Sequence, residues 1–476
     1  MTQKLLVLGA GISGLAAALR LRELAPDSSV SVWEKSGRPG GVLYTVERNG
    51  FQFEQSTDNF ITLVPWGLNL CAKLGISDRL VRTNNRDRRT YVVRRRRLYP
   101  LPDGFMMLAP TRLWPMVTTP LLSPLGKLRA GLELFLPRLK GDPDESIAQF
   151  ARRRLGREVF DRIVEPLLSG IYAGDAEKIS LMATLPRFRE MEKKDRSLIL
   201  AMTKTQRAAR QAKREEESGA RYSMFITLRD GLSSLAEKCV QALPPGTIRY
   251  HRTATRVDRV AADGDRTTRW RVTAADGTEE TVDGLICALP SSMAGDLFAE
   301  SAPAVAEFYH SIEQTGCAVV SLAFSEEQIR RRFHGMGFVV PTKEGGSIIA
   351  GSFSSHKYPH RAPAGWALLR IFVGGARAPG LIDLPDDALL RQVLDELGPL
   401  LDIEGGPSEV EISKWPRGMP QYHLGHLERL AQLNAALDRE PTLALCGNSF
   451  TGVGLPNCIR TGEEAAEKVV KWFVSE

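Results

Sequence analysis

The 476-residue sequence has few cysteines and no cysteine motif. The six are far apart and form no Cys-x-x-Cys pair: Cys71, Cys239, Cys287, Cys317, Cys446 and Cys458. This spacing excludes a zinc ribbon and gives no sign of a disulfide framework. The seven histidines are equally dispersed, and no Ser-His-Asp, Cys-His or metal-ligand grouping is visible. We therefore expect neither a bound metal nor a nucleophile–base pair.

Long apolar runs are missing too. No uninterrupted stretch reaches the roughly 20 apolar residues that span a bilayer. The first predicted strand begins at Lys4, so we expect no signal or transit peptide. These absences predict a protein of the reducing cytoplasm, with at most a peripheral position on the cytoplasmic face of the membrane.

Acidic residues are in the minority. Lys and Arg number 63 against 56 Asp and Glu, which gives a net charge of +7 and a pI of about 9.1. Much of the excess lies in residues 82–97 and 193–214. Such runs are either solvated faces or sites for an anionic substrate or anionic lipid headgroups. No nucleic-acid motif accompanies them, so nucleic acid is not an expected partner. Arg94–Arg97, flanked by apolar residues, is typical of a charged β-hairpin tip.

The first residues have the pattern of a dinucleotide site. An apolar run over 4–8 leads into Gly9-x-Gly11-x-x-Gly14, and an amphipathic helix is predicted over 15–24. In such a strand–turn–helix unit, Gly9 makes the tight turn and Gly11 lets the backbone approach a pyrophosphate. Gly14 lets the helix and the strand pack closely. The helix N-terminus attracts the phosphates.

A carboxylate stands at the spacing that the motif requires. A second strand is predicted over 29–33, and it ends on Glu34, 20 residues beyond Gly14. Glu34 would accept hydrogen bonds from ribose hydroxyls and repel a 2′-phosphate, so the ligand is FAD or NAD rather than NADP. The Glu-x3-Arg-x-Gly-Gly arrangement that ends at Gly41 resembles the flavin amine-oxidase and porphyrinogen-oxidase superfamily, which implies non-covalent FAD. No second Gly-x-Gly-x-x-Gly is present, so a separate NAD(P)H domain is not expected.

Three further blocks resemble one family. They are Glu165–Asp175, Trp415–Tyr422 with Gly425-His426, and Gly447–Ile459. Over nearly the whole chain the sequence resembles the protoporphyrinogen/coproporphyrinogen oxidases of haem and chlorophyll synthesis. Gly454-Leu455-Pro456 is closer to bacterial members that oxidise coproporphyrinogen III. The resemblance implies an FAD-dependent oxidase that removes six electrons from a porphyrinogen in three flavin turnovers, with O2 as acceptor and H2O2 as product.

The resemblance also implies a cofactor site and a substrate site. The expected FAD-binding residues are Gly9, Gly11, Ile12, Ser13, Gly14, Glu34, Lys35, Arg38, Gly40, Gly41, Val257, Trp415, Gly447, Asn448, Thr451, Gly452 and Val453. Asp58 and Asn59 are expected as catalytic residues that orient pyrrole N–H groups, or else as an Asx turn. Arg88 or Arg89 is expected to bind a substrate propionate through charge-assisted hydrogen bonds. His426 is interpreted as structural, with a functional role left open.

The expected fold is α/β. A discontinuous Rossmann-like FAD-binding domain takes residues 1–85, 220–300 and 425–476, and an inserted mixed-sheet substrate domain takes 301–424. Residues 86–219 form a helical, partly apolar region. Its proline-interrupted segment 98–139 is interpreted as a membrane-facing or substrate-access surface, or as ordinary core. The side chains expected to be exposed or half-exposed there are Phe105, Met106, Met107, Leu108 and Trp114.

Several interpretations stay open at this stage. The chain departs from the family at Ser56-Thr57, where Gly-Pro is usual. Among the features of the sequence, only this departure favours a non-catalytic FAD-binding scaffold. An amine oxidase or carotenoid desaturase shares the FAD pattern but lacks the Ser169–Asp175 block. Coproporphyrinogen III carries four carboxylates and protoporphyrinogen IX two, and the arginine-rich hairpin favours the former. The expected partners are the porphyrinogen, O2, a membrane surface, and a ferrochelatase or other haem-pathway enzyme that receives the product.

Overall fold

A five-stranded parallel sheet carries the N-terminal glycine turn. Its strands come from distant parts of the chain, in the spatial order β12 (Ile248–Arg249), β2 (Ser29–Trp33), β1 (Lys4–Leu8), β16 (Gly284–Cys287) and β22 (Leu443–Leu445). The computed structural model describes residues 2–84, 88–215, 224–260, 269–331 and 334–475. β1 and β2 match the two strands predicted from the sequence, and each is buried at four of its five positions. This burial is typical of parallel strands covered on both faces.

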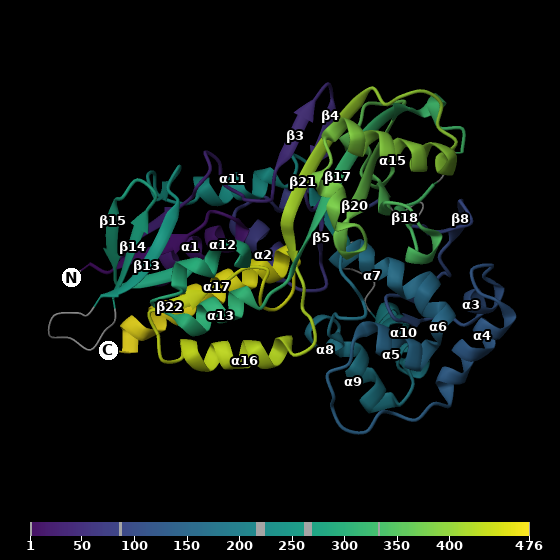
Figure 1. Cartoon of the computed structure of the whole chain (residues 1–476), viewed down its shortest axis with the longest axis horizontal. Coiled ribbons are helices and arrows are strands. Elements are labelled where there is room, and N and C mark those ends of the chain that lie inside the picture. Colours follow the sequence, from purple (N-terminus) through teal and green to yellow (C-terminus); the bar gives the residue numbers. More distant parts are fainter. Residues whose placement is uncertain (1, 85–87, 216–223, 261–268, 332–333, 476) are drawn as a thin grey trace.

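Different layers cover the two faces of this sheet (Figure 1). One face packs on α1 (Ile12–Leu24), α2 (Trp66–Lys73), α11 (Ser233–Gln241) and α17 (Leu455–Ser475). The other packs on an antiparallel sheet and two helices: β13 (Ala254–Val260), β14 (Arg269–Ala274), β15 (Glu279–Val282), α13 (Pro303–His310) and α16 (His426–Leu437). α17 lies so close to α1 that a Cβ on Gly462 would be 2.2 Å from the Ser13 carbonyl oxygen. The two ends of the chain therefore share one core.

A second, seven-stranded sheet is mixed. In spatial order it contains β21 (Glu409–Pro420), β17 (Gln314–Ser325), β20 (Trp366–Gly374), β19 (Ile348–Phe353), β18 (Gly337–Val339), β7 (Thr90–Arg94) and β8 (Arg97–Pro100). Only β18 and β7 pair in parallel. β7 and β8 form the predicted hairpin, with Arg95 and Arg96 at positive φ at its tip, as a two-residue turn requires. The segment 86–219 thus adds two strands to the sheet of 301–424. The boundaries 85/86 and 219/220 lie outside the described residues.

The mixed sheet is covered on one face by α15 (Asp386–Leu401) and on the other by a helical region (Figure 1). The helices of that region are α3 (Trp114–Thr118), α4 (Pro124–Gly131), α5 (Ile147–Leu155), α6 (Arg157–Val159), α7 (Glu165–Tyr172), α8 (Leu181–Thr184), α9 (Pro186–Asp195) and α10 (Leu198–Glu215). The expectation that Phe105 and Leu108 are exposed is wrong, because both are buried in the core that these helices share with the sheet. Trp114 is 73% exposed, as expected. No helix within the described ranges is both long enough and apolar enough to cross a membrane.

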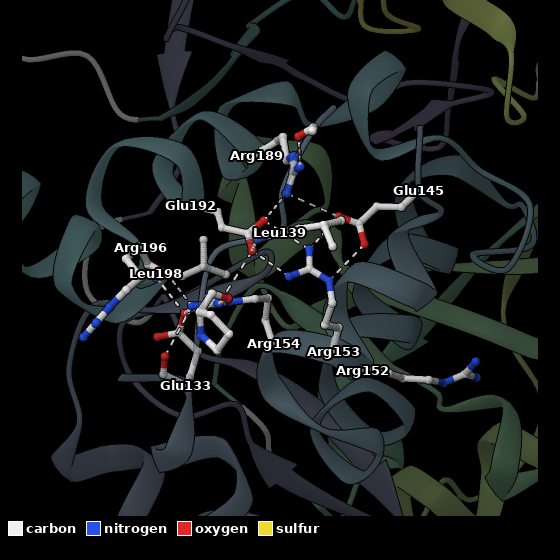
Figure 2. Close-up of polar contacts among 12 residues, drawn as sticks. Glu133, Leu139, Glu145, Arg152, Arg153, Arg154, Arg189, Glu192, Arg196 and Leu198 are labelled. Atoms are coloured by element: carbon white, nitrogen blue, oxygen red, sulfur yellow. Dashed lines mark hydrogen bonds and ion pairs between the residues drawn. The ribbon is translucent and has the colours of Figure 1, made fainter. Parts of the chain in front are cut away.

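An internal ion cluster lies inside the helical region (Figure 2). It consists of Glu133, Glu145, Arg153, Arg154, Arg189 and Glu192. Arg154 Nε donates to Glu133 Oε1 at 3.0 Å, and the Leu198 N–H donates to the same oxygen at 2.8 Å. Glu192 lies 2.5 Å from the nearest guanidinium nitrogen of Arg153. Three positive and three negative side chains therefore balance one another where α5, α9 and the start of α10 meet.

Candidate cofactor and substrate site

The three motif glycines occupy positions that need glycine for different reasons. Gly9 has a φ of +97°, which L side chains rarely adopt. A Cβ on Gly14 would be 1.9 Å from the Gly9 carbonyl oxygen. Gly11 has an ordinary φ of −68°, and a Cβ there would meet no atom within 4 Å. The open space at Gly11 lies at the N-terminus of α1, where the first intrahelical bond runs from the Leu15 N–H to the Gly11 oxygen. The turn fits a pyrophosphate at this helix end.

Glu34 connects the end of β2 to the glycine turn. One carboxylate oxygen accepts from the Ala10 N–H at 2.8 Å, and the other accepts from the Ser36 N–H at 2.8 Å. These bonds hold the buried side chain in place. Its predicted contact with ribose hydroxyls stays a prediction. Lys35, also expected in the site, is exposed.

The Arg-x-Gly-Gly segment lies directly against the turn. The Gly40 N–H donates to the Ala10 carbonyl at 2.8 Å, and a Cβ on Gly41 would be 3.3 Å from the Gly11 Cα. Arg38 donates to the Gly41 carbonyl at 2.8 Å, and its guanidinium lies 4.2 Å from the centre of the Tyr44 ring. The backbone of 38–41 therefore continues the surface that begins at Gly11.

Ser56 and Trp415 extend this surface toward the mixed sheet. Ser56 Oγ donates to the Val42 carbonyl at 2.6 Å, so the side chain that departs from the family pattern is bonded to the neighbouring backbone. Trp415, on β21, donates from Nε1 to the Gln55 carbonyl at 2.8 Å. These bonds bring the expected cofactor residue Trp415 next to segments 42–44 and 55–56.

The turn 447–453 lies between β22 and α17. The Gly447 N–H donates to Thr461 Oγ1 at 3.1 Å, and Thr451 Oγ1 accepts from Arg460 at 2.5 Å. Because β1 and β22 are parallel strands of one sheet, this turn and the glycine turn leave the sheet at the same edge. Val257 is placed differently, since its side chain is buried in the core on the other face. Only its backbone is available for the predicted adenine contact.

Asp58 is surrounded by three cations from the other half of the chain. Its Oδ2 lies 3.2 Å from Lys357 Nζ, 3.2 Å from Arg361 and 3.4 Å from Arg370. Lys357 ends the short helix α14 (Ser354–Lys357), and Arg370 stands in the middle of β20. Asn59 Nδ2 donates to Asp58 Oδ1 at 2.8 Å. The Asp58 carboxylate therefore accepts hydrogen bonds from Asn59, Lys357 and Arg361 and forms an ion pair with Arg370.

These contacts decide the charge of Asp58. Burial alone would raise its pKa, but Lys357, Arg370 and Arg361 outweigh burial and hold the pKa well below its usual range. Asp58 is thus ionised at every physiological pH and is a poor proton acceptor. Its predicted hydrogen bond to a pyrrole N–H would have to compete with these three internal donors.

The three cations were missed by the sequence reasoning. Arg370 interrupts the apolar strand Trp366–Gly374, and a charged residue in a buried strand is a usable signal. Lys357 and Arg361 carry no such signal. The side chains of Arg361 and Arg370 are 0% and 2% exposed, whereas that of Lys357 is 14% exposed. Lys357 is therefore the cation of this cluster that can meet a ligand.

Arg88 and Arg89 directly precede β7. Both are exposed at the start of β7. Earlier in the chain, the Asn84 N–H donates to the Lys357 carbonyl at 3.0 Å. The Met336 N–H donates to the Arg89 carbonyl at 2.8 Å. The placement of the two predicted substrate residues next to the substrate stays a prediction.

Comparison with known proteins finds relatives over nearly the whole chain. The model of the flavin containing amine oxidoreductases matches residues 12–470. The chain is 35% identical to coproporphyrinogen III oxidase of Bacillus subtilis (strain 168), over 98% of both chains. It is 25% identical to protoporphyrinogen oxidase 2, chloroplastic/mitochondrial, of Arabidopsis thaliana, over 99% of this chain and 95% of that one. A crystal structure from Exiguobacterium sp. 255-15 matches with a TM-score of 0.85 and 28% identity, over 99% of both chains. The chain belongs to the flavin containing amine oxidoreductase family.

Proposed function

We propose that this protein is an FAD-dependent oxidase that converts coproporphyrinogen III to coproporphyrin III in haem biosynthesis, with O2 as acceptor and H2O2 as product. The observation that carries the proposal is the full-length relationship to a coproporphyrinogen III oxidase, combined with a glycine turn whose space at Gly11 is open. FAD, bound non-covalently, would supply hydride acceptance at N5. The protein's own part is to place the macrocycle and to balance its charge.

The charge of the site supports coproporphyrinogen III over protoporphyrinogen IX. A tetracarboxylate needs more cationic partners than a dicarboxylate with two vinyl groups. Arg88 and Arg89, which are exposed just before β7, and the partly exposed Lys357 offer such charge. The lower identity to the Arabidopsis enzyme points the same way.

The test is the appearance of porphyrin fluorescence in air when the FAD-loaded protein meets each porphyrinogen separately. We expect a faster rate with coproporphyrinogen III and about one H2O2 for each electron pair. A rate no higher than autoxidation with both substrates, in protein that retains FAD, would refute the oxidase and favour the non-catalytic scaffold.

Removing both candidate propionate residues should weaken substrate binding. For Arg88→Ala/Arg89→Ala we expect the KM for coproporphyrinogen III to rise about tenfold, because a charge-assisted hydrogen bond contributes roughly 1.5–3 kcal/mol. The control is Arg157→Ala/Arg391→Ala, which removes two exposed guanidinium groups elsewhere. An unchanged KM in the first variant, or an equal rise in the control, would exclude the assignment.

We further infer a peripheral contact between segment 113–135 and a lipid surface. Seven large apolar side chains of this segment are exposed: Leu113, Trp114, Val117, Leu125, Leu128, Leu132 and Phe135. Arg112, Arg138 and Lys140 are exposed beside them. Apolar side chains next to cations suit the interface of an anionic membrane. Handover of the product to a ferrochelatase or another haem-pathway enzyme stays a prediction.

The lipid contact predicts weaker vesicle binding when its aromatic residues are changed. Trp114→Ser/Phe135→Ser should reduce the affinity for phosphatidylglycerol-containing vesicles, measured by co-sedimentation, about a hundredfold or more, since burying each ring contributes roughly 1.5–3 kcal/mol. Leu24→Ser/Val474→Ser changes exposed apolar residues elsewhere and should have no effect. Equal binding of both variants would contradict the contact.

A further inference from the structure

The family-like segment 415–426 contains two residues with no role so far, Tyr422 and His426. Tyr422 follows the end of β21 and is buried. Its hydroxyl donates to the Asn448 carbonyl at 2.5 Å and accepts from the Gly452 N–H at 3.0 Å. One side-chain oxygen therefore closes the turn between residues 448 and 452.

His426 supports the same turn at its centre. Its ring stacks on Tyr422 with centroids 4.3 Å apart and planes at 17°. Its Nε2 lies 2.8 Å from the Phe450 carbonyl, which can only accept, so Nε2 carries the proton. Burial lowers the pKa of His426, in keeping with a neutral ring. The two residues together satisfy three backbone groups of the turn.

The turn needs such support because its two glycines give the backbone much conformational freedom to lose when the turn is ordered. Gly447 and Gly452 both have a positive φ, of +128° and +102°. A Cβ on Gly452 would be 2.3 Å from the Asn457 amide nitrogen, so the turn also closes on the first turns of α17. Glycine loses more conformational freedom than other residues when it is ordered. Bonds that order the turn beforehand would lower the cost of binding a ligand there.

We propose that Tyr422 and His426 are positioning residues that hold turn 447–453 in its FAD-binding shape before the cofactor arrives. The proposal rests on the predicted contact between this turn and FAD. The two side chains act from behind the turn, through Asn448, Phe450 and Gly452. They set how tightly FAD is retained.

The test is Tyr422→Phe, which keeps the ring stacked on His426 and removes only the hydroxyl. It leaves the Gly452 N–H without its acceptor, and one such loss corresponds to about a tenfold change in affinity. We expect the FAD dissociation constant, from fluorescence of FAD released on dilution of the holoprotein, to rise about tenfold. With saturating FAD, the KM for porphyrinogen should stay at its wild-type value, while the thermal midpoint should fall in line with the weaker FAD binding.

Tyr309→Phe is the matched control. Tyr309 is also buried, and its ring centre lies 6.0 Å from that of Phe450, but no hydrogen bond joins its hydroxyl to the turn within the described residues. His426→Gln, which keeps a donor for Phe450, should retain FAD better than His426→Leu. An FAD dissociation constant within twofold of wild type in Tyr422→Phe, or an equal rise in Tyr309→Phe, would overturn the proposal. Failure of porphyrinogen oxidation with normal FAD binding would overturn the proposed function instead.

Discussion

Replacing Gly11 with alanine should leave the protein folded and remove most of its affinity for FAD. The φ of Gly11 is −68°, and a Cβ there would touch no protein atom within 4 Å. Nothing in the fold therefore resists the methyl group. The cofactor would resist it, because the pyrophosphate must approach the backbone at this position. Overpacking of about 1–3 kcal/mol corresponds to a loss of affinity of about ten- to a hundredfold.

The Gly11→Ala experiment compares FAD affinity with stability. FAD binding would be measured by titration and the fold by circular dichroism and thermal unfolding. Gly380→Ala is the control, because a Cβ on Gly380 also meets no atom within 4 Å and no predicted cofactor residue is near it in sequence. Gly14→Ala should instead damage the fold, since its Cβ would be 1.9 Å from the Gly9 carbonyl oxygen. Normal FAD affinity in Gly11→Ala would refute the assigned pyrophosphate site.

Arg154→Met should lower the free energy of unfolding by about 3–5 kcal/mol, the usual cost of breaking a buried ion pair. Arg154 and Glu133 are both fully buried, and methionine would leave the Glu133 carboxylate without its guanidinium. The Pro137 carbonyl would lose a donor at the same time. Denaturant unfolding of the FAD-loaded protein at neutral pH measures the loss.

Arg152→Met is the matched control two positions away. Arg152 lies on the same helix but points away from the internal ion cluster (Figure 2). It pairs with Glu177 at the surface, where the two side chains are 38% and 48% exposed. Such a pair contributes at most about 1 kcal/mol. Equal losses of stability in Arg152→Met and Arg154→Met would contradict the difference that burial is expected to make.

Local patterns were sufficient for the parts of the site that lie close together in sequence. The strand at Lys4–Leu8, the glycine turn and Glu34 were predicted because a short apolar run, turn geometry and a fixed spacing are short-range properties. The hairpin of β7 and β8 followed from two apolar runs around a charged tip. The family followed from blocks of sequence spread along the whole chain.

Burial within one segment could not be predicted in the same way. Phe105 and Leu108 lie in an apolar, proline-rich stretch, which is equally compatible with a surface patch and with core. The helices and the mixed sheet that cover them come from residues far along the chain. Burial was equally unpredictable for Arg152 and Arg154. Both are arginines of the same helix, yet the first is exposed and the second is buried.

The sequence by itself determined the dinucleotide turn, the carboxylate that follows it and the family of the chain, because each depends on residues at short, fixed spacings. Only the tertiary structure decided the surroundings of Asp58. Lys357, Arg361 and Arg370 lie about 300 positions away, and no local pattern links them to that carboxylate. Folding of the mixed sheet against segment 54–60 brings the four charges together, so the charge of the site is a property of the assembled layers.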